Sequence, residues 1–225
     1  MFQSIILAGG FGTRLKSISG DIPKPMVNVG TEPFLYMLMR RLEQQGCEHI
    51  VLALHYASQY IIDRISRDQP VSCKVSFSVE EAPLGTGGAI KKSSALISAD
   101  VFVVLNGDTL CDIDYSELLL AALDVDVIVA AARVSDVSRY GRLGTDKDRN
   151  ITELNEKNNS GPGLINAGTY VVKKRDVKNF PKTSFSFEND FLADFAGSIK
   201  AHPVFGEFVD IGIPSDYQYA CEKLS

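Results

Sequence analysis

The sequence lacks the cysteine spacing that would hold a fold together through metal ions or disulfide bonds. Its four cysteines, at positions 47, 73, 111 and 221, are widely scattered, and no two form a C-x-x-C pair. This spacing argues against a zinc site and against a thioredoxin-like redox pair. A chain of 225 residues can bury about 70% of its unfolded surface and needs no such staple. We therefore expect free thiols in a reducing compartment.

A surplus of basic residues and long apolar runs are also absent. Lys and Arg total 23 against 28 Asp and Glu, for a net charge of −5, which argues against a nucleic-acid partner. No stretch approaches the roughly 18–20 apolar residues that a membrane helix needs. The short apolar run Ile5–Ala8 has no basic segment before it, so no signal peptide is expected. These features favour a soluble, cytoplasmic protein without a membrane partner.

Several signatures of catalysis are missing as well. There is no G-x-S-x-G nucleophile motif, and the only histidines are at 49, 55 and 202. The segment Gly9–Gly12 does not match the dinucleotide fingerprint, because Leu15 stands at the last glycine position. It does not match a P-loop either, because no Gly-Lys-Ser/Thr follows. These absences disfavour serine hydrolases, P-loop enzymes and nicotinamide oxidoreductases.

What is present is an alternation of strands and helices over residues 1–135. Apolar runs and one alternating segment predict strands at 5–8, 50–54, 73–79, 101–105 and 125–132. Helical periodicity predicts helices at 33–45, 58–66, 85–97 and 116–123. Asp114 is the expected N-cap of the last helix, and Gly46 the expected stop of the first. The glycine-rich segment 9–20 is expected to form no regular element.

The second part of the chain has a different pattern. Strands predicted at 142–145, 151–154 and 164–172 follow one another without helices, and helices are predicted at 187–196 and 214–224. The expected fold class is therefore α/β. It has a Rossmann-like, mainly parallel sheet with helices on both faces, plus a small antiparallel region in the second half. No repeat or linker divides the chain, so residues 1–225 are expected to form one domain.

The end of the first strand is a candidate anion site. Gly9, Gly10 and Gly12 leave backbone N–H groups at the carboxyl edge of the sheet, where phosphate is the usual ligand. Arg14 and Lys24 add a planar fork and a point charge to the same segment. The alternative is a glycine-rich connector that binds nothing.

Asp108 is a candidate metal ligand. It follows the most apolar strand and stands beside the small Gly107, in a position that suits Mg²⁺ with one or two carboxylates, phosphate oxygens and water. A turn or cap role stays open, and Asp112 and Asp114 are rival ligands. Spacing alone does not bring Asp210 near Asp108.

Together these motifs resemble the signature of the sugar-1-phosphate nucleotidylyltransferases. The resemblance rests on Leu-Ala-Gly-Gly-Phe-Gly-Thr-Arg-Leu at 7–15, followed by Pro-Lys-Pro at 23–25. It extends along nearly the whole chain through the segments 84–89, 105–108, 156–157, 166–168 and 209–217. Residues 9–108 and 185–192 look most like the bacterial D-glycero-D-manno-heptose 1-phosphate guanylyltransferases. In two departures, Asn158 replaces a proline and Ile213 stands where threonine is common.

The resemblance implies a Mg²⁺-dependent reaction in which an NTP and a sugar 1-phosphate give an NDP-sugar and pyrophosphate. GTP and D-glycero-D-manno-heptose 1-phosphate are the implied substrates, for a surface polysaccharide. Such transfer depends on positioning and charge neutralisation rather than on a protein nucleophile. Two alternatives stay open. One is uridylyl transfer, or guanylyl transfer to another sugar 1-phosphate such as that of mannose or an amino sugar. The other is a non-catalytic nucleotide-sugar-binding regulator.

The resemblance also assigns roles to individual residues. Catalysis is assigned to Arg14, Lys24 and Asp108, and metal binding to Asp108 and Asp210. Nucleotide binding, by the half 1–135, is assigned to Leu7, Ala8, Gly9, Gly10, Gly12, Thr13, Arg14, Lys24, Glu81, Pro83, Leu84, Gly85, Thr86, Asn106 and Gly107. Sugar-phosphate binding, by the half 136–225, is assigned to Tyr140, Gly141, Glu156, Lys157, Asn166 and Gly168.

Some of these roles have competing interpretations. Without the resemblance, Glu156-Lys157 would be interpreted as a solvated surface pair, and the Tyr140 ring as packing only. Glu80 or Glu81 could accept the N1–H and N2–H donors of guanine, or either could be strand-end surface. The sequence leaves open whether one or two metal ions bind, and it allows a homodimer.

Overall fold

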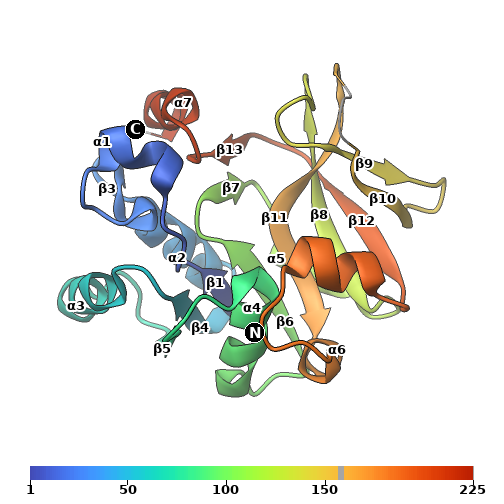
Figure 1. Cartoon of the computed structure of the whole chain (residues 1–225), viewed down its shortest axis with the longest axis horizontal. Helices are drawn as coiled ribbons and strands as arrows, with labels where there is room; N and C mark the ends of the chain where they lie inside the picture. Colours follow the sequence, from blue (N-terminus) through green and yellow to red (C-terminus); the bar gives the residue numbers. More distant parts are fainter. Residues whose placement is uncertain (157–159, 225) are drawn as a thin grey trace.

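The computed structural model describes residues 1–156 and 160–224, which are built around a seven-stranded sheet (Figure 1). In spatial order its strands are β12 (Ile199–Val204), β8 (Val127–Val134), β11 (Gly163–Lys173), β6 (Val101–Asn106), β1 (Phe2–Leu7), β4 (Cys47–Leu54) and β5 (Lys74–Val79). All but β11 run in one direction. The predicted α/β class with a mainly parallel sheet is confirmed.

Strand β11 occupies a position that the sequence did not indicate. It lies inside the main sheet, antiparallel to both β6 and β8, rather than beside the first half. Its Tyr170, Val171 and Val172 are fully buried. A strand covered on both faces requires such a continuous apolar run, and this central position carries the segment 166–170 to the middle of the sheet.

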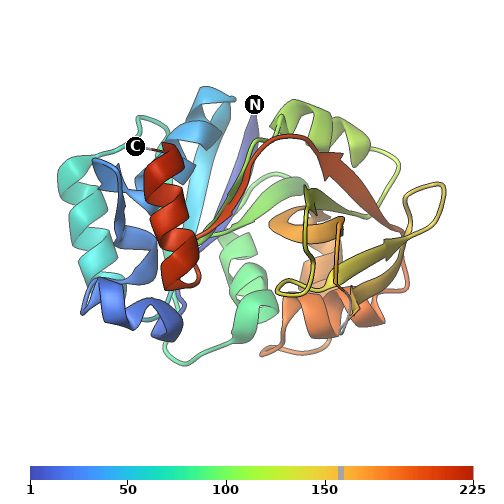
Figure 2. The same cartoon turned by 90° about the horizontal axis from the view of Figure 1, so that it is seen from above.

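Helices cover both faces of the sheet, as Figure 2 shows from above. They are α1 (Lys16–Ser19), α2 (Phe34–Gln44), α3 (Ser58–Asp68), α4 (Gly85–Ser93), α5 (Tyr115–Ala121), α6 (Lys174–Asn179), a π-type helix (Phe187–Leu192) and α7 (Pro214–Leu224). Two hydrophobic cores result. Ile6 faces the core under α2, α3 and α5, whereas its neighbour Ile5 faces the core under α4, α6 and the Phe187–Leu192 helix. This alternation follows from the two-residue period of a strand.

The ends of the helices follow local chemistry. The Asp114 carboxylate accepts hydrogen bonds from the amides of Ser116 and Glu117 at 2.8 and 3.1 Å, and so caps α5 as predicted. Gly46 follows α2 with φ of 90°, as expected of a C-terminal stop. The expectation for 9–20 was wrong in part, because Thr13–Leu15 forms a 3₁₀ turn and α1 follows it. Leu15 is fully buried and anchors these turns.

Three two-stranded antiparallel sheets lie beside the main sheet in the described part of the chain. They are β2 (Asn28–Val29) with β3 (Glu32–Pro33), β7 (Thr109–Cys111) with β13 (Phe208–Asp210), and β9 (Arg142–Thr145) with β10 (Ile151–Glu156). The second pair joins the two parts of the chain across the end of the sheet (Figure 1). Among the described residues, no helix has the length and apolar content to cross a bilayer.

Candidate functional site

A cavity of about 340 Å³ opens at the carboxyl ends of β1, β4 and β6. This is the edge at which open α/β sheets bind their ligands. Sequence-predicted residues make up most of its lining: Leu7, Gly9, Gly10, Lys24, Pro83, Gly85, Thr86, Asn106, Gly107 and Asp108. The structure thus brings the glycine segment, the 80–86 loop and the Asn-Gly-Asp turn together around one space.

Glu80, which the sequence offered for base recognition, also lines the cavity, and the other lining residues had no role assigned from the sequence: Phe11, Pro25, Ala53, His55 and Ala89. Glu80 is buried, and its Oε2 accepts a hydrogen bond from the Leu84 amide at 2.9 Å. Glu81 is exposed and does not line the cavity. Of the two glutamates that the sequence offered for base recognition, the structure therefore places Glu80 at the cavity.

An aromatic group stands at the mouth of the cavity. The Phe11 side chain is 56% exposed, and its ring lies 5.6 Å from the His55 ring and 5.4 Å from the Tyr56 ring. His55 Nδ1 is 3.1 Å from the Glu80 carbonyl oxygen, which fixes the imidazole against the 80–84 loop. His49, by contrast, is buried in β4 beside Ser76 and does not line the cavity.

The glycine segment is shaped by close contact with Lys24. Gly12 has φ of +60°, and a Cβ atom there would lie 2.8 Å from the Lys24 Cβ, so only glycine fits without strain. Ala8, Gly12, Thr13 and Leu84 lie next to the cavity in sequence but do not line it. Arg14 is exposed and has no hydrogen-bond or ion-pair partner among the described residues. Its guanidinium fork is available to an incoming anion.

Lys24 and Asp108 form the charged centre of the site. The Lys24 side chain is only 10% exposed, and its Nζ donates to Asp108 Oδ2 at 2.6 Å. Lys24 lies in a short 3₁₀ turn, Lys24–Met26, whose three residues are all buried. The Gly107 amide donates to the Leu7 carbonyl at 2.9 Å, which holds the Asp108 turn against β1. The Lys24 ammonium is therefore held in place by the packing around its side chain.

Asp210 joins this pair through the β7–β13 ladder. It is the register partner of Thr109, and the Ile211 amide donates to the Asp108 carbonyl at 2.9 Å. Burial raises the pKa of the Asp210 carboxyl, the Asp108 charge raises it further, and Lys24 opposes the rise. A divalent cation bound between two neighbouring carboxylates would relieve the repulsion between them. Two carboxylates are enough for Mg²⁺ when phosphate and water supply the other oxygen ligands. No group of three or more potential metal-ligating side chains occurs in residues 1–156 and 160–224.

Two predicted sugar-side residues lie next to this centre. Gly168 has φ of +71°, and a Cβ atom there would lie 2.7 Å from both Asn106 Nδ2 and Thr109 Oγ1. It sits where the register of β11 against β8 shifts, between Asn166 and Tyr170. Such bulges re-aim side chains and are frequent next to active sites. The Asn166 Oδ1 accepts from the Gly168 amide at 2.9 Å and stabilises this turn.

A partly buried hydrogen-bond network that includes the cavity residue Thr86 was not predicted. Glu188 accepts hydrogen bonds from Thr86 Oγ1 at 2.8 Å, Tyr170 Oη at 3.0 Å and Ser186 Oγ at 3.2 Å. The Tyr170 hydroxyl in turn accepts from Asn166 Nδ2 at 2.8 Å. The network therefore links Thr86, which is predicted to bind the nucleotide, with Asn166, which is predicted to bind the sugar phosphate. In the sequence, Glu188 is one of three polar residues between Phe187 and Phe191, and no pattern distinguishes it from the other two.

The remaining sugar-side residues lie on two segments. Tyr140 and Gly141 lie between β8 and β9, with the Tyr140 ring packed edge-on against Phe208 at 5.5 Å. Burial raises the pKa of Tyr140 to about 12, with a contribution from Asp216, so the hydroxyl keeps its proton at neutral pH. Glu156 is the last residue of β10, and Lys157 lies outside the described residues.

Comparison with known proteins agrees with this geometry. The model of the nucleotidyl transferase family matches residues 3–222. The D-glycero-alpha-D-manno-heptose 1-phosphate guanylyltransferase of Campylobacter jejuni is 39% identical over 220 residues, covering 96% of this chain and 97% of the relative. The protein of the same name from Aneurinibacillus thermoaerophilus is 33% identical over 227 residues, covering 99% and 98%.

A solved structure is also similar to this chain. The crystal structure of HddC from Yersinia pseudotuberculosis is 50% identical and superposes with a TM-score of 0.94, with 100% of both chains covered. A structure of HddC complexed with GMP-PN gives the same values. The structural similarity to HddC therefore covers the glycine segment, the segments that carry Asp108 and Asp210, and the strands β9 to β11 of the second half.

Proposed function

Because the chain belongs to the nucleotidyl transferase family, we propose that it transfers the guanylyl group of GTP to D-glycero-D-manno-heptose 1-phosphate. The chain is an enzyme of this class, and the predicted family is confirmed. In the reaction, a phosphate oxygen of the sugar bonds to the α-phosphorus of GTP while the bond to the β-phosphate oxygen breaks. The products are GDP-heptose and pyrophosphate.

One observation supports this reaction above the others. The buried Lys24 ammonium, paired with Asp108 at 2.6 Å, stands beside Asp210 at the wall of a cavity that the glycine segment also lines. An in-line transfer between two phosphates adds no protein nucleophile and needs fixed charges around the α-phosphorus. A fixed cation that pairs with one carboxylate and acts electrostatically on a second, with backbone amides nearby, is such an arrangement.

We assign the phosphate contacts to the first part of the chain. The segment Gly9–Thr13 approaches the triphosphate with backbone amides, because Gly9 and Gly10 line the cavity. Arg14, exposed in the 3₁₀ turn that follows the glycine segment, would offer a bidentate fork to the phosphates. Lys24 neutralises negative charge that develops on the α-phosphate during transfer.

Asp108 and Asp210 are the residues that would hold Mg²⁺, since the two carboxylates are neighbours at the same sheet edge. The ion would neutralise phosphate charge and orient the phosphate oxygens. These roles for the two aspartates are assigned by the resemblance and by their juxtaposition.

We assign guanine recognition to the 80–86 loop. Glu80 Oε2 is occupied by the Leu84 amide, so Oε1 is the oxygen that would accept the N1–H and N2–H donors of guanine. Uracil offers a single N–H donor at this edge, so a carboxylate acceptor favours guanine. Pro83, Gly85 and Thr86 line the same wall of the cavity.

The sugar phosphate is assigned to the second part of the chain, residues 136–225. Its candidate contacts are Tyr140, Gly141, Glu156, Lys157, Asn166 and Gly168. Gly168 brings this group against Asn106, next to the charged centre. Use of the product in surface polysaccharide synthesis, a cytoplasmic location and a homodimeric state stay predictions of the sequence.

The first experiment is pyrophosphate release with Mg²⁺, in which each of the four NTPs is combined with the 1-phosphates of heptose, mannose, glucose and N-acetylated amino sugars. Release with GTP and heptose 1-phosphate alone is the expected result. Release with UTP would keep the enzyme class and overturn the assignment of Glu80. No release with any pair, from folded protein that still binds an NTP, would overturn the proposed reaction.

A further inference from the structure

Arg139 and Asp216 form an ion pair between two segments that flank the site. Arg139 lies in the loop between β8 and β9, and Asp216 in the first turn of α7. The Arg139 Nη1 donates to Asp216 Oδ1 at 2.8 Å, and Nη2 donates to Oδ2. The Asp216 side chain is 16% exposed and that of Arg139 is 45% exposed. A bidentate pair with one half-buried partner is more specific than an ordinary surface ion pair.

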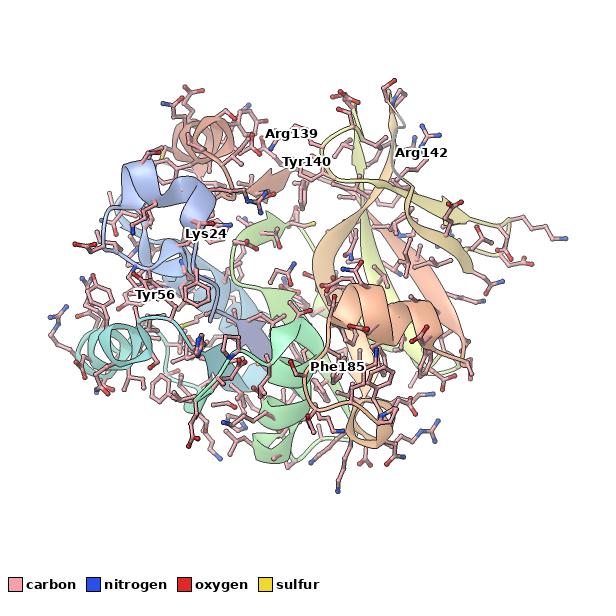
Figure 3. All side chains as sticks on the ribbon, in the orientation of Figure 1. Lys24, Tyr56, Arg139, Tyr140, Arg142 and Phe185 are labelled. Atoms are coloured by element: carbon pink, nitrogen blue, oxygen red, sulfur yellow. The ribbon has the colours of Figure 1, made fainter. Side chains whose placement is uncertain are left out.

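Tyr140 extends this contact to a second point. Figure 3 shows Arg139 and Tyr140 together beside α7, and the guanidinium carbon lies 5.1 Å from the centre of the Tyr140 ring. The Tyr140 hydroxyl reaches Asp216 Oδ2 at 3.4 Å, and its ring contacts Phe208 of β13. The turn 137–141 is itself fixed, because the amides of Tyr140 and Gly141 both donate to the Val137 carbonyl at 3.0 Å.

These contacts lie at the two ends of the segment 208–216, which carries Asp210. Phe208 precedes Asp210 by two residues, and Asp216 follows it by six. Between them, β13 pairs with β7 over three residues, and Val209 and Ile211 are buried in the core, so the middle of the segment is anchored independently of its two ends. Two neighbouring carboxylates repel each other, so keeping Asp210 beside Asp108 costs free energy that contacts along the segment and at its ends must offset.

We propose that Arg139 is a positioning residue: by holding Asp216, it fixes the segment 208–216 so that Asp210 stays beside Asp108 and in register with the sugar-side turn 137–141. The role in cation and sugar-phosphate binding rests on the proposed function. The restraint on the segment does not depend on it. Among the described residues, Arg139 makes its ion pair with Asp216 and acts on the Asp210 carboxyl through its charge, without a hydrogen bond to Asp108 or Asp210.

Hydrogen exchange tests the restraint without any ligand. We expect Arg139→Gln and Asp216→Asn each to raise amide exchange in 208–216 by about tenfold, and the double variant to raise it no further, since the two side chains act through one contact. Arg67→Gln is the matched control, because Arg67 pairs with Asp68 on the exposed side of α3. Unchanged exchange in Arg139→Gln, or additive effects in the double variant, would overturn the proposal.

Cation binding tests the consequence. With GTP present, the Mn²⁺ affinity measured by electron paramagnetic resonance should fall about tenfold in Arg139→Gln and recover in part in Arg139→Lys. The KM for GTP should stay near the wild-type value, while that for the sugar phosphate rises. Raised exchange without any change in Mn²⁺ affinity or in the KM for the sugar phosphate would reduce Arg139 to a structural residue and overturn the positioning role. If the wild-type protein failed to form GDP-heptose, the proposed function would fail while the exchange result stood.

Discussion

Asp210 lies beside Asp108 because the Ile211 amide donates to the Asp108 carbonyl at 2.9 Å, at the end of the β7–β13 ladder. The two carboxylates share one cation of the protein, Lys24, which contacts Asp108 directly and opposes the rise in the pKa of Asp210. The charge balance of the site is therefore set by three residues from three distant segments. Removing any one of these charges disturbs the other two.

Asp108→Asn is expected to lower kcat by at least about 100-fold at saturating Mg²⁺, because the shape is kept while the charge that pairs with Lys24 and is proposed to bind the metal is lost. Steady-state pyrophosphate release with GTP measures this loss. Asp112→Asn is the control, since the Asp112 side chain is 76% exposed and its ion pair with Arg41 is long, at 3.8 Å. Near-normal turnover of Asp108→Asn would remove this residue from the metal site.

The site could be predicted from the sequence where its residues are local. Gly9, Gly10, Lys24 and Asp108 stand in contiguous motifs, and each of them lines the cavity. Glu188 could not be assigned, because its partners Thr86 and Tyr170 lie on other elements and no spacing rule connects them.

Arg14→Lys keeps the positive charge and removes the bidentate fork, so kcat/KM for GTP should fall by about 10- to 100-fold. The free energy of unfolding should not change, because Arg14 is exposed and pairs with no described residue. Kinetics and urea denaturation of the same preparation measure both effects. Arg67→Lys, at an exposed ion pair on α3, supplies the control. Full activity of Arg14→Lys would contradict a phosphate-binding role.

Glu188→Gln should destabilise the fold, because three hydroxyl groups donate to the Glu188 carboxylate and glutamine replaces one of its two oxygens by an NH₂ group. An NH₂ group placed against a donor leaves both unsatisfied, at a cost of about 1–3 kcal/mol. Tyr170→Phe should cost a similar amount, and the double variant should cost less than the sum, since both act on one network. Urea denaturation measures all three, with Tyr60→Phe on the exposed face of α3 as control. Additive losses would show that the two side chains act independently.

The fold was predictable wherever a segment carried its own periodic signal. Strands β1, β4, β6 and β8 each contain a continuous apolar run, and α2 has an apolar stripe, so local pattern and final structure agree. The pairing of β7 with β13 was not predictable, because three-residue strands are too short to show a periodicity. Such strands are stabilised by tertiary contacts with distant parts of the chain. The insertion of β11 between β6 and β8 was likewise decided by tertiary packing.

Asp126 should make stability depend on pH in acid. Its hydrogen bond from Lys173 at 2.8 Å, with help from Ser198, lowers the pKa of its carboxyl from 3.8 to about 2. A depressed folded-state pKa contributes stability that is complete above the unfolded value and is lost as the pH falls from about 4 to about 2. Asp126→Asn should therefore cost about 1–2 kcal/mol at pH 7 and progressively less below pH 4.

Urea denaturation of wild-type and variant protein between pH 3 and pH 7 measures this difference. Asp124→Asn, at an exposed aspartate two residues earlier, should show no such trend. A loss of stability in Asp126→Asn that stayed constant with pH would assign the effect to packing rather than to the charge on Asp126.

Phe11 should contact the nucleoside of the bound nucleotide. Its ring is 56% exposed at the cavity mouth, where an apolar group gains by covering a base or ribose. Phe11→Ala should raise the KM for GTP by about 2- to 10-fold with little change in kcat, since stacking contributes about 0.5–1.5 kcal/mol beyond area burial. The chain contains no tryptophan, so Phe11→Trp would carry a single indole, whose emission can be excited selectively over that of the tyrosines.

The emission of Phe11→Trp should shift when GTP is added without sugar phosphate, because the indole passes from solvent to a covered position. Phe205→Trp is the matched control, since Phe205 is 86% exposed and lies outside this cavity. A signal that moves with GTP in both variants would report a change of the whole protein. A signal that stays fixed in Phe11→Trp, in protein that binds GTP by calorimetry, would place the nucleoside away from Phe11 and leave the ring to pack on His55 and Tyr56 alone.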